Sequence, residues 1–126
     1  MTNVYSGTKE VSYIISDTKR VTDMVSGVRV VLVNGVPLPS ALIQEENQND
    51  NYRCYDWGFM GNRELGMNLS ASILDHQYPN INIEYELVYM FFKTVVSKFD
   101  DVWLITGDEI EGFVPELYKE LFGEKI

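Results

Sequence analysis

The chain has 126 residues, of which 45% are hydrophobic, 13% aromatic and 23% charged. This length fits one domain, and sixteen Phe, Tyr and Trp side chains exclude a disordered chain because they are enough to form a core. Ten Lys and Arg against nineteen Asp and Glu give a net charge of −9, which disfavours direct binding to nucleic acid. We expect a single domain over residues 1–126, strand-rich over 1–60 and helical over 61–123.

Several absences in the sequence bear on location and cofactors. No apolar run approaches the ~20 residues that a membrane span needs. The N-terminal residues lack the basic and apolar regions of a secretory signal. The single cysteine, Cys54, cannot form an intramolecular disulfide. The chain also has only one histidine, His76, so Cys and His side chains are too few for a zinc site. These features predict a cytoplasmic protein without membrane contact, metal or bound cofactor.

The first half of the chain is typical of β-strands. β-Branched and aromatic residues predict strands at Glu10–Ile15 and Val28–Val33. The second strand leads into Asn34-Gly35, the dipeptide that favours a type I′ hairpin turn. The prolines of Val36–Pro39 allow only a short edge segment after this turn, because proline cannot donate to a ladder. The polar run over residues 44–51 predicts an exposed loop.

Helical signals begin at Asn62. Its side chain is a candidate N-cap for a helix that ends at Tyr78–Asn80. Gly66 inside this helix costs about 1 kcal/mol relative to Ala, which predicts either a close packing partner or a late helix start. A second helix is expected from Ile83 to Lys98, since its apolar residues recur at helical spacing.

The end of the chain predicts one more strand-like segment and one more helical region. Val102–Ile105 predicts a short buried strand or an apolar connector. Thr106 and Glu109 have the spacing of a capping box at the start of a third helix. Pro115 is expected to interrupt that helix and begin another, which Gly123 closes. The fold class that follows is α+β, with a small antiparallel sheet from the N-terminal half packed against two to three C-terminal helices.

Five short motifs occur in order along the chain, at Asn34–Leu38, Tyr55–Gly61, Leu69–His76, Tyr89–Val96 and Trp103–Ile110. The chain is similar, over roughly residues 28–113, to a domain-of-unknown-function family (number sixty-one sixty-six). Its members occur in phage, plasmid and archaeal genomes, so the resemblance implies a mobile-element context and no assigned activity. The family carries a glycine- and proline-containing loop where this chain has Gly61–Glu64.

The glycine-rich turn before the first helix is one candidate binding site. A further short strand is expected over Arg53–Trp57, and it leads into the turn Gly58–Gly61. Free N–H groups at the helix start and a guanidinium would attract an anion, while aromatic rings could stack on a base. The alternative is a tight turn whose aromatic side chains belong to the core. The predicted site for a nucleotide-like ligand comprises Tyr55, Trp57, Phe59, Asn62 and Arg63.

The acidic second half is the other candidate. Residues 1–63 carry six basic and seven acidic side chains, whereas residues 64–126 carry four and twelve. An acidic face suits a basic surface on another protein, although the same charges also serve solubility. The predicted partner surface comprises Asp100, Asp101, Asp108, Glu109, Glu111 and Glu116.

The sequence assembles no nucleophile–base pair and no metal set, so we expect a non-catalytic protein. His76 is expected to interact with the carbonyls at a helix end, and Cys54 to be a small buried side chain. We predict a phage or mobile-element accessory factor that acts in the bacterial cytoplasm and antagonises a host defence protein with a basic surface. One alternative is a sponge that sequesters a nucleotide-derived signal. Another is a structural, homo-oligomeric protein that self-associates through exposed Tyr85 and Tyr89.

Overall fold

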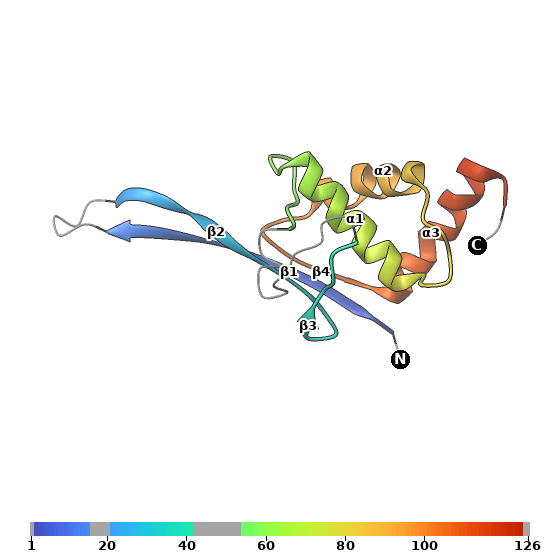
Figure 1. Ribbon diagram of the computed structural model, residues 1–126, viewed down its shortest axis with the longest axis horizontal. Coiled ribbons are helices and arrows are strands. Elements are labelled where there is room, and N and C mark those ends of the chain that lie inside the picture. The colour runs from blue at the N-terminus through green and yellow to red at the C-terminus, as the bar shows by residue number, and fades with distance from the viewer. Residues whose placement is uncertain (1, 16–20, 42–53, 125–126) are drawn as a thin grey trace.

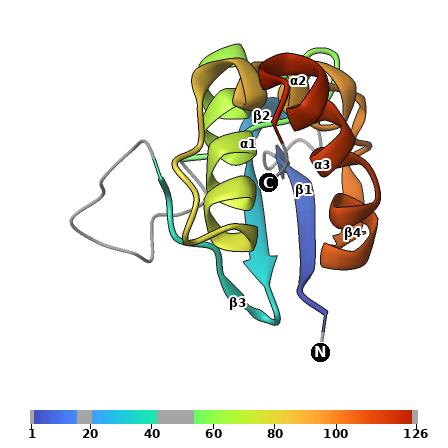
Figure 2. The ribbon, with the colours of Figure 1, turned by 90° about the vertical axis from the view of Figure 1, so that its right-hand side faces the viewer.

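The computed structural model describes residues 2–15, 21–41 and 54–124, and these ranges carry every structural statement below. The fold is α+β, as expected: a four-stranded antiparallel sheet with helices on one face (Figure 1, Figure 2). The strand order is β3-β2-β1-β4. The fourth strand comes from the C-terminal half of the chain and joins the sheet beside the first. The strands are β1 (Val4–Ile15), β2 (Val21–Val33), β3 (Val36–Pro37) and β4 (Val102–Thr106).

The hairpin formed by β1 and β2 is longer than its partners in the sheet. The two strands pair from Tyr5↔Val33 to Ile15↔Val21. In contrast, β4 pairs with β1 only as far as Thr8. Figure 1 shows the rest of the hairpin extending away from the helices as an arm. The strands expected at 10–15 and 28–33 are therefore confirmed, but each is part of a longer strand.

The turn between β2 and β3 has the expected geometry. Asn34 and Gly35 have φ angles of 52° and 84°, the positive values that a type I′ turn requires. The Asn34 side chain also accepts a hydrogen bond from the Val4 backbone N–H, at 2.8 Å. β3 then has only two residues, which confirms the short edge segment.

The first helix, α1 (Arg63–Gln77), begins and packs as the sequence indicates. The Asn62 side chain accepts a hydrogen bond from Leu65 N at 3.0 Å, which confirms the N-cap. A Cβ on Gly66 would lie 2.5 Å from Phe92 Cε1. The glycine is therefore required by the close approach of the neighbouring helix, and the helix does not start late.

The second expected helix is divided into two pieces. α2 (Tyr85–Thr94) is followed by a single 3-10 turn, η2 (Val96–Lys98). The backbone N–H of Val95 still makes the α-helical bond to Phe91 O at 2.9 Å. The next bond, from Lys98 N to Val95 O at 3.1 Å, spans only three residues, as in a 3-10 helix. The expected apolar face, Val88, Phe91 and Val95, packs inward: Val88 and Phe91 are buried and Val95 is half-buried. Val96 of the 3-10 turn is buried as well.

The third helix, α3 (Gly107–Phe122), corrects one prediction. The capping box of Thr106 and Glu109 and the left-handed Gly123 (φ 69°) are present as expected. Pro115 lies inside this continuous helix and starts no new one, so the predicted interruption was wrong. Pro115 cannot bond to the carbonyl of Glu111, but Glu111 is exposed and water can reach that carbonyl.

A further strand was predicted over Arg53–Trp57, and its described part is not a strand. Residues 54–57 form no ladder, and all four side chains are buried. The segment contacts both layers: Asn68 of α1 donates to Cys54 O at 2.8 Å, and Asp56 forms ion pairs with two cations of the sheet. The loop expected over residues 44–51 lies outside the described residues.

The core fills the space between the helices and the inner face of the sheet. Tyr5, Val31 and Ile105 point inward from three different strands and are at most 7% exposed. The opposite face of the sheet carries no described helix, and Val102 and Leu104 there are 69% and 62% exposed. None of the described helices is long and apolar enough to cross a membrane.

Candidate functional site

The turn predicted to bind a nucleotide-like ligand has two of its rings in the core. Tyr55 and Trp57 are 0% and 1% exposed. The Tyr55 hydroxyl donates to Leu38 O at 2.7 Å, and Trp57 Nε1 donates to Asp100 O at 2.9 Å. Burial therefore leaves neither ring a free face on which a ligand could stack.

The other three residues of that predicted site lie in different surroundings. Phe59 is 92% exposed at the tip of the turn, and Asn62 is occupied as the N-cap of α1. The Arg63 guanidinium lies over the Tyr89 ring, 5.5 Å from its centroid. Phe59 lines a cleft beside Trp57, whereas Arg63 lines a different groove along α1. The five predicted residues do not surround one cavity.

A buried carboxylate that the sequence analysis did not single out lies at the centre of this region. Asp56 accepts hydrogen bonds from Trp57 N at 2.8 Å and from Asn62 N at 2.7 Å. It also forms ion pairs with Lys9 of β1 (2.9 Å) and Arg29 of β2 (3.3 Å). Its two cationic partners lie 47 and 27 residues before it in the chain, so no local sequence motif indicates this cluster. The cluster joins the base of the arm to the start of α1.

The protonation of Asp56 reflects two opposing effects. Burial by itself would raise the pKa of its carboxyl group. The hydrogen bonds from Asn62, Lys9 and Trp57, together with the charge of Arg29, outweigh burial and hold the pKa below its ordinary value. The group is therefore a carboxylate at neutral pH, and its surroundings explain it as a structural anion.

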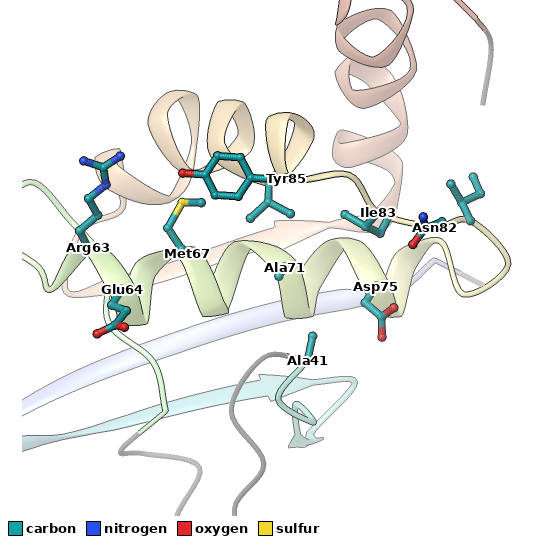
Figure 3. A pocket seen from close by; sticks show the side chains of 11 residues that line it. Ala41, Arg63, Glu64, Met67, Ala71, Asp75, Asn82, Ile83 and Tyr85 are labelled. Atoms are coloured by element: carbon teal, nitrogen blue, oxygen red, sulfur yellow. The ribbon is translucent and has the colours of Figure 1, made fainter. Parts of the chain in front are cut away.

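A groove along α1 has walls that are mostly apolar. Its volume is about 720 Å³, and Met67, Ala71 and Ile83 line its middle. Figure 3 shows Arg63 at one end and Asp75 at the other, with the Tyr85 ring above the helix. Such a lining suits an apolar or aromatic ligand that carries an anionic group near the guanidinium.

The predicted acidic surface is divided by β4. Asp100 and Asp101 directly precede the strand, whereas Asp108 and Glu109 follow it after Gly107, in the first turn of α3. We call these four exposed side chains the β4 carboxylates. Glu116 lies further along α3. Four of the six predicted residues therefore lie at the two ends of one strand, and Glu111 and Glu116 lie along α3, so the six do not form a single cluster.

The acidic side chains differ in what they contact. Glu109 closes the capping box with Thr106. Glu111 accepts a hydrogen bond from Gln77 Nε2 at 3.2 Å. Within the described ranges, the side chains of Asp100, Asp101 and Asp108 have no hydrogen bond or ion pair, so their charge faces solvent.

β4 forms one edge of the sheet, and its hydrogen bonds show which residues face outward. At its start Lys9 N donates to Asp101 O at 2.8 Å, and beyond its end Gly107 N donates to Asn3 O at 2.7 Å. Bonded pairs alternate along an antiparallel ladder, so every second residue from 101 to 107 bonds to β1. The residues between them direct their backbone N–H and C=O groups away from the sheet.

His76 and Cys54 both have structural roles. His76 Nδ1 is hydrogen-bonded to the Tyr5 hydroxyl at 2.8 Å, in place of the helix-end carbonyls that the sequence indicated. Burial raises the pKa of Tyr5 to about 12. Cys54 is buried, as expected. No group of three or more metal-ligating side chains is gathered within the described residues.

Comparison with family models, with curated proteins and with solved structures finds no match to this chain. The resemblance to the domain-of-unknown-function family therefore stays a prediction, and the function is argued from geometry and charge.

Proposed function

We propose that the protein is a non-catalytic binding protein that docks through the β4 carboxylates on a basic surface of a partner protein. The observation that carries this proposal is that the negative charges beside β4 are not neutralised by described cations. Each ion pair within the described residues involves Asp56, which is buried. The three aspartates next to β4 have no cationic partner among the residues that the structure describes, so a basic protein gains their attraction without breaking a described contact.

The setting of this binding follows from the predicted resemblance. A phage or mobile-element protein acts inside a bacterial host, and host proteins that handle nucleic acid carry the basic surfaces that fit these carboxylates. We propose such a host protein, for example a defence nuclease, as the partner. Attraction between exposed charges is screened over about 8 Å at physiological salt, so binding should weaken steeply as salt rises.

Three immobilised forms of the protein test the proposal in a bacterial lysate. One is the wild type, and one carries Asp100→Asn, Asp101→Asn and Asp108→Asn. The matched control removes three exposed carboxylates elsewhere, with Asp75→Asn, Glu84→Gln and Glu86→Gln. We expect a basic protein that the wild type and the control capture at low salt and release at high salt. Equal capture by the variant lacking the β4 aspartates would contradict the proposal.

The α1 groove favours a second candidate, a sponge for a nucleotide-derived signal. The groove of about 720 Å³ places Arg63 beside apolar walls, although the ligand would not lie at the predicted turn. Native mass spectrometry before and after denaturation would reveal a small molecule that co-purifies with the protein. We expect Arg63→Ala or Met67→Trp to remove it, since one deletes the cation and the other fills the groove. An unchanged bound mass in both variants would exclude the groove.

A further inference from the structure

In the part of the chain that the structure describes, two residues of β4 have backbone groups without hydrogen-bond partners. Val102 and Leu104 lie between the residues that bond to β1, so their N–H and C=O groups point to the free edge. The backbone groups of Thr106 also point to this edge, but its N–H donates a hydrogen bond to Glu109 Oε1 at 3.2 Å. Among the described residues none bonds to the edge groups of Val102 and Leu104. Such an edge is ready to pair with another extended chain.

The side chains at this edge are apolar. Val102 and Leu104 are 69% and 62% exposed on the face of the sheet that no described helix covers. On the same face, Ser6 and Thr8 lie opposite them on β1 and have no charge. An added strand would therefore find backbone donors and acceptors together with apolar side chains at alternate positions.

The charges at the two ends of β4 select the occupant. A strand of five residues spans about 17 Å, with Asp100 and Asp101 at one end and Asp108 and Glu109 at the other. A second copy of this chain, paired antiparallel, would bring the first pair of carboxylates against the second pair. That repulsion disfavours self-pairing. An extended segment with a cation at each end would instead be attracted at both.

We propose that the β4 edge binds an extended peptide segment of the partner by strand addition, and that this segment has alternating apolar side chains and a Lys or Arg at each end. The inference rests on the proposed function, binding to a basic protein, and names the part of the partner that is bound. Backbone hydrogen bonds provide affinity. Val102 and Leu104 contact the apolar side chains of the peptide, and the β4 carboxylates attract the cations at its two ends.

Labelled synthetic peptides test the edge directly by fluorescence anisotropy. The basic probe is Lys-Thr-Val-Thr-Val-Thr-Lys, and the acidic probe has the same core with Glu at both ends. We expect the wild type to bind the basic probe at least tenfold more tightly than the acidic one. Replacing Asp100, Asp101 and Asp108 together with Lys should reverse this preference. No difference between the probes would overturn the proposal.

Two further measurements separate strand addition from attraction by charge alone. Leu104→Pro removes an N–H that points away from β1, so the ladder survives while the edge is blocked. Leu104→Thr is the matched control, since it keeps the N–H. A basic probe that is N-methylated on its hydrogen-bonding edge makes the same test without altering the protein. We expect Leu104→Pro and N-methylation each to lower affinity at least tenfold, and Leu104→Thr to lower it less.

The outcomes distinguish this inference from the proposed function. If the basic probe binds but neither the proline nor the N-methyl groups matter, the edge is not used and charge alone explains binding. If neither probe binds while the lysate capture still depends on the β4 aspartates, strand addition is refuted and the proposed function stands. If the capture fails as well, both are refuted.

Discussion

Replacing Asp56 with Asn tests whether the buried cluster holds the arm to the helical layer. The carboxylate is 4% exposed and accepts two backbone hydrogen bonds besides its ion pairs with Lys9 and Arg29. An Asn side chain keeps the volume and one acceptor oxygen. It loses the charge and directs an amide NH₂ toward groups that are themselves donors, so both the attraction and part of the hydrogen bonding are lost.

The size of the effect follows from the exposure of the partners. Removing one member of a fully buried ion pair typically costs 3–5 kcal/mol, because the other charge is left without a counterion. The Lys9 and Arg29 side chains are 21% and 27% exposed, so water can solvate them in part. We therefore expect Asp56→Asn to lower the free energy of unfolding by about 2–4 kcal/mol. This is a large share of the roughly 5–15 kcal/mol that such domains have.

Urea unfolding followed by tryptophan fluorescence measures this loss, with exposed Asp100→Asn as the control that should change stability by under about 0.5 kcal/mol. The lowered pKa of Asp56 fixes the pH dependence. Its stabilisation is complete above the unfolded-state pKa of about 3.9 and is lost as pH falls through the lower folded-state value. Wild type and variant should therefore converge in acid. Equal stability at neutral pH, or a difference that persists in acid, would refute the reasoning.

Three other changes have defined outcomes. Gly7→Ala places a Cβ within the Trp103 indole and should cost about 1–3 kcal/mol in urea unfolding. Pro115→Ala restores a helical N–H and should raise the melting temperature, whereas an unchanged value would mean that the missing bond has no cost. Burial raises the pKa of Tyr5 and Tyr78 to about 12, above the unfolded value of about 10. Their stabilisation is complete below pH 10 and lost toward pH 12, so tyrosinate absorbance should rise together with unfolding.

The features predicted correctly from the sequence are those that depend on near neighbours. The N-cap at Asn62, the capping box at Thr106 and the turn at Asn34 each involve residues within three positions of one another. The predicted break at Pro115 failed because only the surroundings show whether a lost hydrogen bond can be replaced by water.

The features that escaped prediction are those that join distant segments. The pairing of β4 with β1 brings residues about 100 positions apart into register. That register decides both which β4 residues face the free edge and where the acidic pairs lie. A short buried strand or connector was predicted between Asp100 and Asp108, and a strand is present, but its open edge and its exposed face were not predicted. Likewise, the place of Asp56 depends on two strands that precede it by dozens of residues.

The cluster around Asp56 also bears on the order of folding. Lys9 and Arg29 lie directly opposite one another where the arm leaves the body of the protein. Two like charges in this arrangement oppose hairpin formation, although the hairpin is otherwise the contact that a nascent chain reaches first. The base of the arm should therefore close only after residues 54–62 bring the carboxylate between the two cations. This makes the hairpin and the helical layer one cooperative unit, and a peptide of residues 1–38 alone should not hold the register seen here.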